Sequence, residues 1–243
     1  MSRDPRIDFI IIGAQKAGTT ALFDHLSDDP ALSLSRVKEV HFFDNDRLDW
    51  NRPDYDSYHH QFAVADHRIR GEATPIYAYW PKALERIAVY RPDIRLIFML
   101  RDPVARAWSH WRMETSRGVE TLPFSQAIRR GRQRLFRSEP WGHHREYSYV
   151  ERGYYADQLE RLLGLFAREQ LLILQAEDLQ SDPATVLTRF NAFVGAPPPP
   201  ATAPRQVHVG QDMGEMDPSD RAWLQQVFAP DQARLAGLLG FGG

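Results

Sequence analysis

Residues 13–20 read Gly-Ala-Gln-Lys-Ala-Gly-Thr-Thr, a glycine-rich loop with one lysine and two closing threonines. The free backbone N–H groups of such a loop, the positive end of a following helix and the Lys16 ammonium would converge on one point and attract a phosphate-like anion. The alternative is an ordinary glycine turn with a solvated lysine. The apolar run at residues 9–12, directly before the loop, favours the anion site because such motifs connect a strand to a helix.

The lysine spacing separates this loop from that of the nucleotide triphosphatases. In their loop, four residues lie between the glycines and the lysine directly precedes Ser or Thr, whereas Lys16 is followed by Ala17 and Gly18. The next long apolar run ends in Leu100-Arg101, where a magnesium-binding carboxylate would be expected. A P-loop nucleotide or small-molecule kinase is therefore the disfavoured alternative, and we expect no metal requirement.

Three apolar runs alternate with helical patterns along the chain. Residues 9–12, 94–100 and 171–174 are typical of strands buried on both faces of a sheet. A helix is expected after each of them: from Thr19, over 104–117 and over 183–194. This alternation predicts a parallel, right-handed α/β sheet. With the loop, it predicts a P-loop-containing three-layer fold, a central parallel sheet flanked by helices.

The length of 243 residues is compatible with a single domain over 1–243. Residues 115–148 interrupt this alternation of strands and helices. We interpret them as an insertion over the active face, on the side where the acceptor of a transferred group would bind. The four prolines at 197–200 predict an extended linker. Residues 197–243 would then be this linker and a C-terminal helical tail that begins near 217–218.

Composition limits the partners and the compartment. The formal net charge of −2 gives no overall field for nucleic acid, and the lack of cysteine excludes disulfides and thiolate metal sites. The charged residues 1–8 and the short apolar runs predict neither a signal peptide nor a membrane span. We expect a cytoplasmic protein, with the oligomeric state left open.

Four motifs occur in a fixed order along the chain: the loop 13–20, Lys-Glu-Val-His-Phe-Phe at 38–43, Gly-Glu-Ala-Thr-Pro at 71–75, and Leu-Arg-Asp-Pro at 100–103 with Ser109 beyond. Together they resemble the sulfotransferases that use 3′-phosphoadenylyl sulfate (PAPS), above all the heparan-sulfate-type branch and its bacterial relatives. The resemblance implies transfer of a sulfuryl group from PAPS to a hydroxyl, or an amine, of a carbohydrate or small molecule. The product nucleotide would be adenosine 3′,5′-bisphosphate (PAP).

The resemblance also implies a donor site. Lys16 would contact the bridging oxygen of the phosphosulfate and the loop would bind the 5′-phosphate, while Arg101 and Ser109 would hold the 3′-phosphate. A planar guanidinium suits that task because it can meet two phosphate oxygens. For Arg101 the alternative is a salt bridge to Asp102. The candidate nucleotide-binding residues are Gln15, Lys16, Ala17, Gly18, Thr19, Thr20, Arg101, Ser109, Tyr154 and Arg205.

Glu39 is the candidate general base, since it matches the carboxylate that similar enzymes place just before the His-Phe-Phe segment. Glutamate is ionised at neutral pH and can take the proton of the acceptor. Lys16 and His41 complete the candidate catalytic set, and His41 is the rival base. The alternative for His41 is a packed histidine beside Phe42 and Phe43, which the neighbouring aromatic residues favour.

This chain departs from the family at two places. Several relatives carry lysine where this chain has Ala73, and Lys38 or an arginine of the insertion could substitute. The C-terminal Lys-Gly element of many relatives is not recognisable, with Arg205 and His208 as weak replacements. These departures keep open a third function, a nucleotide-binding module without catalysis.

Other residues have more than one interpretation. Glu72 and Thr74 would line the acceptor side, brace Glu39 or only form the turn before Pro75. The arginines between 129 and 137 would recognise an anionic acceptor or form a solvated face. Trp108, Trp111 and Trp141 belong to the core more often than to a sugar-binding surface.

Overall fold

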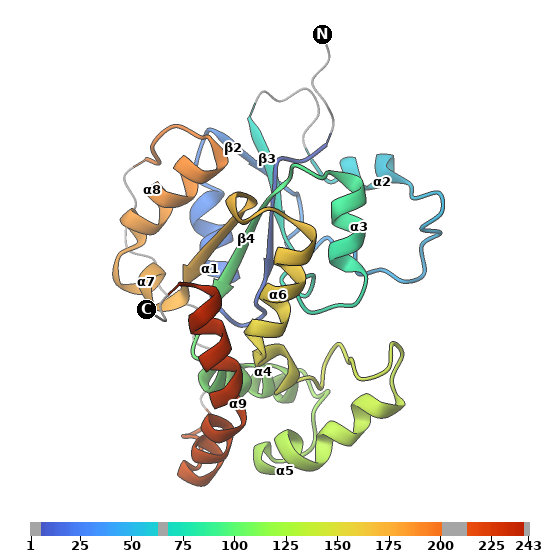
Figure 1. The fold of residues 1–243 in the computed structure, drawn as a ribbon, viewed down its shortest axis with the longest axis vertical. Helices are drawn as coiled ribbons and strands as arrows, with labels where there is room; N and C mark the ends of the chain where they lie inside the picture. The colour runs from blue at the N-terminus through green and yellow to red at the C-terminus, as the bar shows by residue number, and fades with distance from the viewer. Residues whose placement is uncertain (1–5, 63–67, 201–212, 241–243) are drawn as a thin grey trace. The chain divides into compact units, whose positions relative to one another are not determined.

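The computed structural model describes residues 6–62, 68–200 and 213–240 (Figure 1). The chain forms two compact units. Unit 1 comprises Met1–Leu100 and Leu165–Val207, and unit 2 comprises Arg101–Gly164 and His208–Gly243. The interpretation as a single domain stays a prediction.

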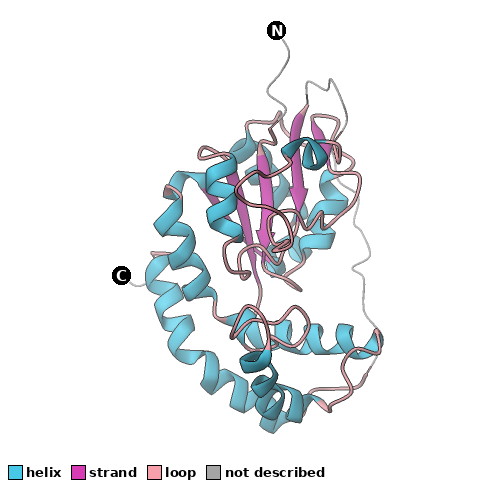
Figure 2. Cartoon of the chain, turned by 90° about the vertical axis from the view of Figure 1, so that its right-hand side faces the viewer, coloured by secondary structure: helices cyan, strands magenta, loops and turns pink. Residues whose placement is uncertain are grey.

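Unit 1 contains a five-stranded sheet in the order β2-β3-β1-β4-β5, with every neighbouring pair parallel. Figure 2 shows its strands side by side. The central strand β1 is wholly buried, as expected for a parallel strand covered on both faces. The predicted α/β fold class is confirmed. The strands are β1 (Phe9–Gly13), β2 (Leu32–Leu34), β3 (Ile69–Ala73), β4 (Arg95–Leu100) and β5 (Leu171–Gln175).

Helices of unit 1 lie on both sides of these strands (Figure 1). Helix α1 connects β1 to β2 in one direction across the sheet, and α3 connects β3 to β4 in the other. Because such crossovers are right-handed, opposite directions put the two helices on opposite faces. The helices are α1 (Thr19–Leu26), α2 (Tyr55–His59), α3 (Ala83–Tyr90), α7 (Ala176–Ser181) and α8 (Pro183–Val194), with a short 3₁₀ turn η3 (Arg168–Gln170) before β5.

The sequence patterns found three of the five strands and missed β2 and β3. Strand β2 has only three residues, too few for a periodic pattern. Strand β3 reads Ile-Arg-Gly-Glu-Ala, which lacks the apolar run of a buried strand. Its Gly71 is paired with Phe9 of β1, and an added Cβ at Gly71 would overlap the Phe9 ring.

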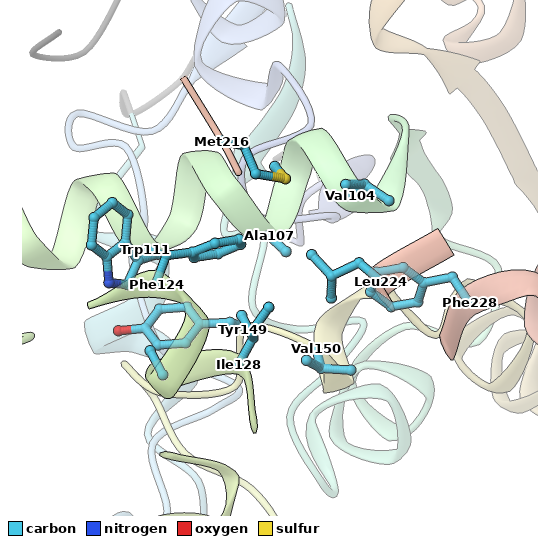
Figure 3. Packing of buried hydrophobic residues seen from close by; sticks show 11 residues of the cluster. Val104, Ala107, Trp111, Phe124, Ile128, Tyr149, Val150, Met216, Leu224 and Phe228 are labelled. Atoms are coloured by element: carbon cyan, nitrogen blue, oxygen red, sulfur yellow. The ribbon is translucent and has the colours of Figure 1, made fainter. Parts of the chain in front are cut away.

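Unit 2 is built mainly from helices around one apolar cluster. Figure 3 shows side chains from α4, α5 and α9 in this cluster, among them Val104, Trp111, Phe124, Leu224 and Phe228. The elements are α4 (Pro103–Ser116), α5 (Phe124–Arg129), η1 (Arg130–Arg137), η2 (Glu151–Gly153), α6 (Tyr155–Leu165, whose last residue belongs to unit 1) and α9 (Pro218–Leu238). The predicted C-terminal helix near 217–218 is confirmed as α9. Within the described ranges, no helix is both long and apolar enough to span a membrane.

The arginines of residues 129–137 are not simply a solvated face. Arg129 pairs with Asp220, Arg132 with Glu151 at 2.7 Å, and Arg134 with Glu120 at 2.7 Å. These ion pairs connect α5 and η1 to distant parts of unit 2. Their partners lie up to 91 residues away, a distance at which helical spacing carries no information.

The tryptophans divide between core and surface. The indoles of Trp108 and Trp111 stack with centroids 4.9 Å apart, and Trp111 is buried, so the core interpretation of these two is confirmed. For Trp141 it is wrong, because 69% of the residue is exposed. Trp141 packs instead against Phe136, which is itself exposed.

We expect Gly71→Ala to lower the free energy of unfolding by about 1–3 kcal/mol, because its methyl group would overpack the Phe9 ring in the sheet. Urea titration followed by circular dichroism measures the change. Gly164→Ala in α6 is the matched control, since a Cβ there meets nothing within 4 Å. The control should be neutral or stabilising by up to about 1 kcal/mol. Equal stability of Gly71→Ala and the wild type would refute the register of β1 and β3.

Candidate functional site

The loop after β1 is fixed to the sheet at its carboxyl end. Ala14 donates its N–H to the Met99 carbonyl of β4 at 2.8 Å, and Ala17 donates to Ala14 at 3.0 Å. An added Cβ at Gly13 would come within 2.9 Å of Ala78 Cβ, so glycine permits this close packing. Parallel α/β sheets bind ligands outside the carboxyl ends of their strands, which is where this loop lies.

The loop geometry suits an anion. Lys16 and Gly18 both adopt left-handed backbone conformations, with φ of 69° and 83°. This curls the chain immediately before α1, whose N-cap residue Gly18 makes no side-chain hydrogen bond to the helix. The N-cap residue therefore supplies no side chain to the first N–H groups of α1, and Thr19 and Thr20 open the helix there. The residues present fit the phosphate of a nucleotide.

A second segment, residues 38–44, is attached to the adjacent strand. Glu39 donates its N–H to the Ala73 carbonyl at the end of β3, at 2.9 Å. Thr74, the next residue, donates to the Ile11 carbonyl of β1 at 3.1 Å. Since β1 and β3 are parallel neighbours, the loop and Glu39 lie at the same edge of the sheet.

The Glu39 carboxylate is held between two cationic side chains. Lys38 Nζ lies 2.8 Å from Glu39 Oε1, and His41 Nε2 lies 3.4 Å from Oε2. The other ring nitrogen of His41, Nδ1, lies 2.9 Å from the Asp44 carboxylate, which is completely buried. The result is a charge-balanced chain from Lys38 to Asp44. Lys38, one of the residues considered as a substitute for the lysine that is missing at Ala73, thus lies beside Glu39.

These contacts determine the charge states. Burial by itself would raise the pKa of Glu39, but the hydrogen bond to His41 and the charge of Lys38 outweigh it and lower the pKa to about 2. The hydrogen bond to Asp44, followed by that to Glu39, raises the pKa of His41 to about 9. At neutral pH Glu39 is therefore a carboxylate and His41 an imidazolium.

Backbone strain marks the same residues. In the described part of the chain, four residues other than glycine have positive φ: Lys16, Glu39 (65°), His41 (56°) and Lys82. Such conformations cost roughly 1–3 kcal/mol each and cluster at functional sites. All three predicted catalytic residues are in this small group, which is an observation independent of their side-chain contacts.

His41 corrects one interpretation. Its side chain is 45% exposed rather than packed, while Phe42 and Phe43 are buried. The left-handed turns at 39 and 41 separate the histidine from its aromatic neighbours, so adjacency in sequence did not mean a shared environment. The same turns bring the side chains of Glu39 and His41 together.

Glu72 belongs to a buried network. Its carboxylate accepts hydrogen bonds from Tyr58 Oη and Thr74 Oγ1, both at 2.6 Å. Burial raises the pKa of Glu72 to about 7, against the lowering effect of these hydrogen bonds. Tyr77 Oη lies 3.3 Å from the same carboxylate and accepts the N–H of Phe42 at 3.0 Å. Of the three roles considered for Glu72 and Thr74, the structure supports bracing of the Glu39 segment.

The sequence did not single out Asp44, Tyr58 or Tyr77 as site residues. The spacing of Asp44, three residues after His41, is the one signal that could have found it. The tyrosines carried no signal, because only the fold brings them to Glu72.

Three of the predicted nucleotide-binding residues belong to unit 2. Arg101 follows β4 directly and is partly buried, and Ser109 lies on α4. The carboxylate of Asp102 accepts the Ala105 N–H at 2.7 Å as the N-cap of α4, a role other than the salt bridge considered for Arg101. Tyr154 packs against Phe228 with ring centroids 5.7 Å apart. Arg205 and His208 lie outside the described residues.

Comparison with known families identifies the chain. The model of the sulfotransferase domain family matches residues 6–209, which include both segments of the site. The chain belongs to the sulfotransferase domain family. The resemblance seen in the motifs is thereby confirmed, and the donor of this family is PAPS.

Relatives of this sulfotransferase domain include bacterial and mammalian proteins. A sulfotransferase structure from Alicyclobacillus acidocaldarius is 31% identical, with a TM-score of 0.82 over 97% of this chain and 96% of the other. Mouse heparan sulfate glucosamine 3-O-sulfotransferase 3A1 is 32% identical over 194 residues, 76% of this chain and 45% of the relative. The human 3B1 protein is 33% identical over 189 residues, with the same coverage. The chain thus spans about half the length of these curated relatives.

We expect Asp44→Asn to lower the pKa of His41 from about 9 toward its ordinary value of 6.5, because the amide removes the charge that stabilises the imidazolium. NMR titration of the imidazole C–H signals, assigned with His41→Gln, measures the shift. The stabilisation from the charged His41 is complete below about pH 6.5 and is lost as the pH rises through about 9. Asp44→Asn should lack this contribution, so the free energy of unfolding of the variant should change less between pH 6.5 and 9.

Asp46→Asn is the control for this titration, because Asp46 pairs with Arg86 instead of His41. A pKa of His41 that is the same in Asp44→Asn and in the wild type would show that the buried carboxylate does not set its charge.

Proposed function

We propose that this protein transfers the sulfuryl group of PAPS to a carbohydrate hydroxyl, with Glu39 as general base. The observation that carries the proposal is the Glu39 carboxylate, oriented by His41 and Asp44 and hydrogen-bonded through its backbone to the strand beside the Lys16 loop. An amine acceptor fits the same chemistry. Family membership supports sulfuryl transfer over the kinase alternative.

Each residue has a defined task in this proposal. Bound PAPS supplies a sulfuryl group on a phosphate leaving group. Lys16 and the N-terminus of α1 stabilise the charge that develops on that phosphate, as in phosphoryl transfer. Glu39 accepts the proton of the acceptor hydroxyl, and His41, held by Asp44, orients the carboxylate. Arg101 and Ser109 are assigned to the 3′-phosphate on the family resemblance.

For the acceptor we propose a pocket of about 580 Å³ within unit 2. Phe136 and Trp141 offer exposed aromatic faces with ring centroids 5.5 Å apart, suited to the apolar side of a sugar ring. Arg132, paired with Glu151 on the pocket wall, adds polar groups for hydroxyls or a carboxylate. The glucosamine acceptors named for the mammalian relatives belong to the same chemical class.

We expect Glu39→Gln to lower turnover at least about a hundredfold, the range for general-base catalysis, and to leave PAP affinity within twofold. Transfer of ³⁵S from labelled PAPS to desulfated heparan oligosaccharides measures turnover, and calorimetric titration with PAP in EDTA measures binding. Glu85→Gln on α3 is the control with unchanged turnover.

The same titration tests the function itself. Tight PAP binding without metal supports the sulfotransferase, whereas binding of ATP only with magnesium would favour the kinase. PAP binding with no sulfate transfer to any acceptor would favour the non-catalytic module. Near-normal turnover of Glu39→Gln would eliminate Glu39 as the base.

We expect Trp141→Ala to raise the KM for the oligosaccharide roughly 3–10-fold, because one aromatic contact contributes about 0.5–1.5 kcal/mol. The PAP affinity should not change. Trp141→Phe keeps an aromatic face and should restore most of the loss. An unchanged KM in Trp141→Ala would remove this pocket from acceptor binding.

A further inference from the structure

Lysine is rare in this chain. Only three of its 30 basic residues are lysine, namely Lys16, Lys38 and Lys82, and the other 27 are arginine. One lysine lies in the anion loop and one beside Glu39. Arginine would bind a carboxylate through two N–H groups of its planar guanidinium, whereas lysine carries a compact charge on a flexible side chain and changes partner more easily. The choice of lysine at 38 therefore fits a cation that must move.

The resting contacts of Glu39 oppose its use as a base. Lys38 contacts one carboxylate oxygen and His41 the other, and the Lys38 side chain is only 18% exposed. A carboxylate neutralised by two cations holds a transferred proton weakly. One of the two cations must release Glu39 before it becomes an effective base.

Lys38 is the cation that can leave. His41 is anchored through Nδ1 to the buried Asp44, whereas Glu39 is the one carboxylate that Lys38 contacts in the described part of the chain. The residue of β3 that is bonded to the Glu39 backbone is the buried Ala73, which carries no charge of its own.

We propose that Lys38 is a partner-switching catalytic residue: its ammonium neutralises Glu39 in the free enzyme and moves to the sulfonate oxygens of bound PAPS, which frees Glu39 to accept the acceptor proton. The proposal rests on the proposed function. Binding of the correct donor would thereby activate the base, because only a donor with a sulfonate attracts Lys38 away.

The transfer step balances with the groups named. The bond between sulfur and the bridging oxygen breaks, and its electron pair goes to the 5′-phosphate of PAP. The acceptor oxygen forms the new bond to sulfur, and its proton goes to Glu39. Lys38 stays on the sulfonate oxygens during the transfer and returns to Glu39 after product release and loss of the proton to solvent.

We expect Lys38→Met to weaken PAPS binding roughly tenfold and to leave PAP binding within twofold, because only PAPS carries the sulfonate. Calorimetric titration of both nucleotides in the absence of acceptor measures the two affinities. Lys82→Met, at the exposed start of α3, is the matched control and should change neither. Unchanged PAP affinity also shows that Lys38→Met is folded.

A second measurement follows the switch directly. In protein with ¹³C-labelled glutamate carboxyls, with Glu39 assigned by comparison with Glu39→Gln, PAPS should raise the pKa of Glu39 and PAP should not. Lys38→Arg keeps the charge without the mobility, so it should bind PAPS well but turn over about tenfold more slowly. Wild-type turnover in Lys38→Arg would contradict the need for movement.

The outcomes separate this inference from the proposed function. If the wild type binds neither PAP nor PAPS, the proposed function fails. If it binds both and Lys38→Met keeps the wild-type ratio of the two affinities, the proposed function survives and the switch is wrong. A Glu39 carboxyl whose titration is the same with PAPS and with PAP would also overturn the switch.

Discussion

The hydrogen bond from the Glu39 N–H to the Ala73 carbonyl connects the chemistry of this protein to its fold. Residues 38–44 have no regular secondary structure, so their side chains depend on this attachment for position. Ala73 ends a strand that is paired in parallel with β1, and β1 continues into the Lys16 loop. One end of the sheet thereby carries both the Lys16 loop and the Glu39 segment. A loop attached to a rigid sheet can hold strained conformations that an isolated loop would lose.

Two glutamates near this end of the sheet show how burial and hydrogen-bond partners give similar residues different pKa values. Glu72 precedes Ala73 in the chain and Glu39 is hydrogen-bonded to the Ala73 carbonyl, yet the pKa values of the two glutamates move in opposite directions. Glu72 is surrounded by hydroxyl donors without a cation, so burial dominates. Glu39 has two cationic partners that outweigh burial. At neutral pH Glu39 is therefore fully ionised, whereas Glu72 is only partly ionised.

The imidazolium of His41 adds an orienting contact to the same carboxylate. Its charge depends on Asp44, a fully buried group that follows the buried Phe42 and Phe43 in the chain. The backbone N–H of Phe42 donates to the Tyr77 hydroxyl, which connects this segment to the Glu72 network. Packing beneath the surface thus determines the charge state of an exposed histidine.

The sequence by itself determined the fold class, three of the five strands, the anion loop and the candidates Lys16, Glu39 and His41. These features are local: apolar runs, glycine positions and short motifs are read from neighbouring residues. Strands β2 and β3 were missed, because β2 is too short for a periodic pattern and β3 contains a buried glutamate and an arginine. Tertiary structure alone decided the partners of Glu39, the exposure of His41 and Trp141, and the ion pairs of the unit 2 arginines. Each of these depends on contacts between residues distant in sequence, or on left-handed turns that residue type does not forecast.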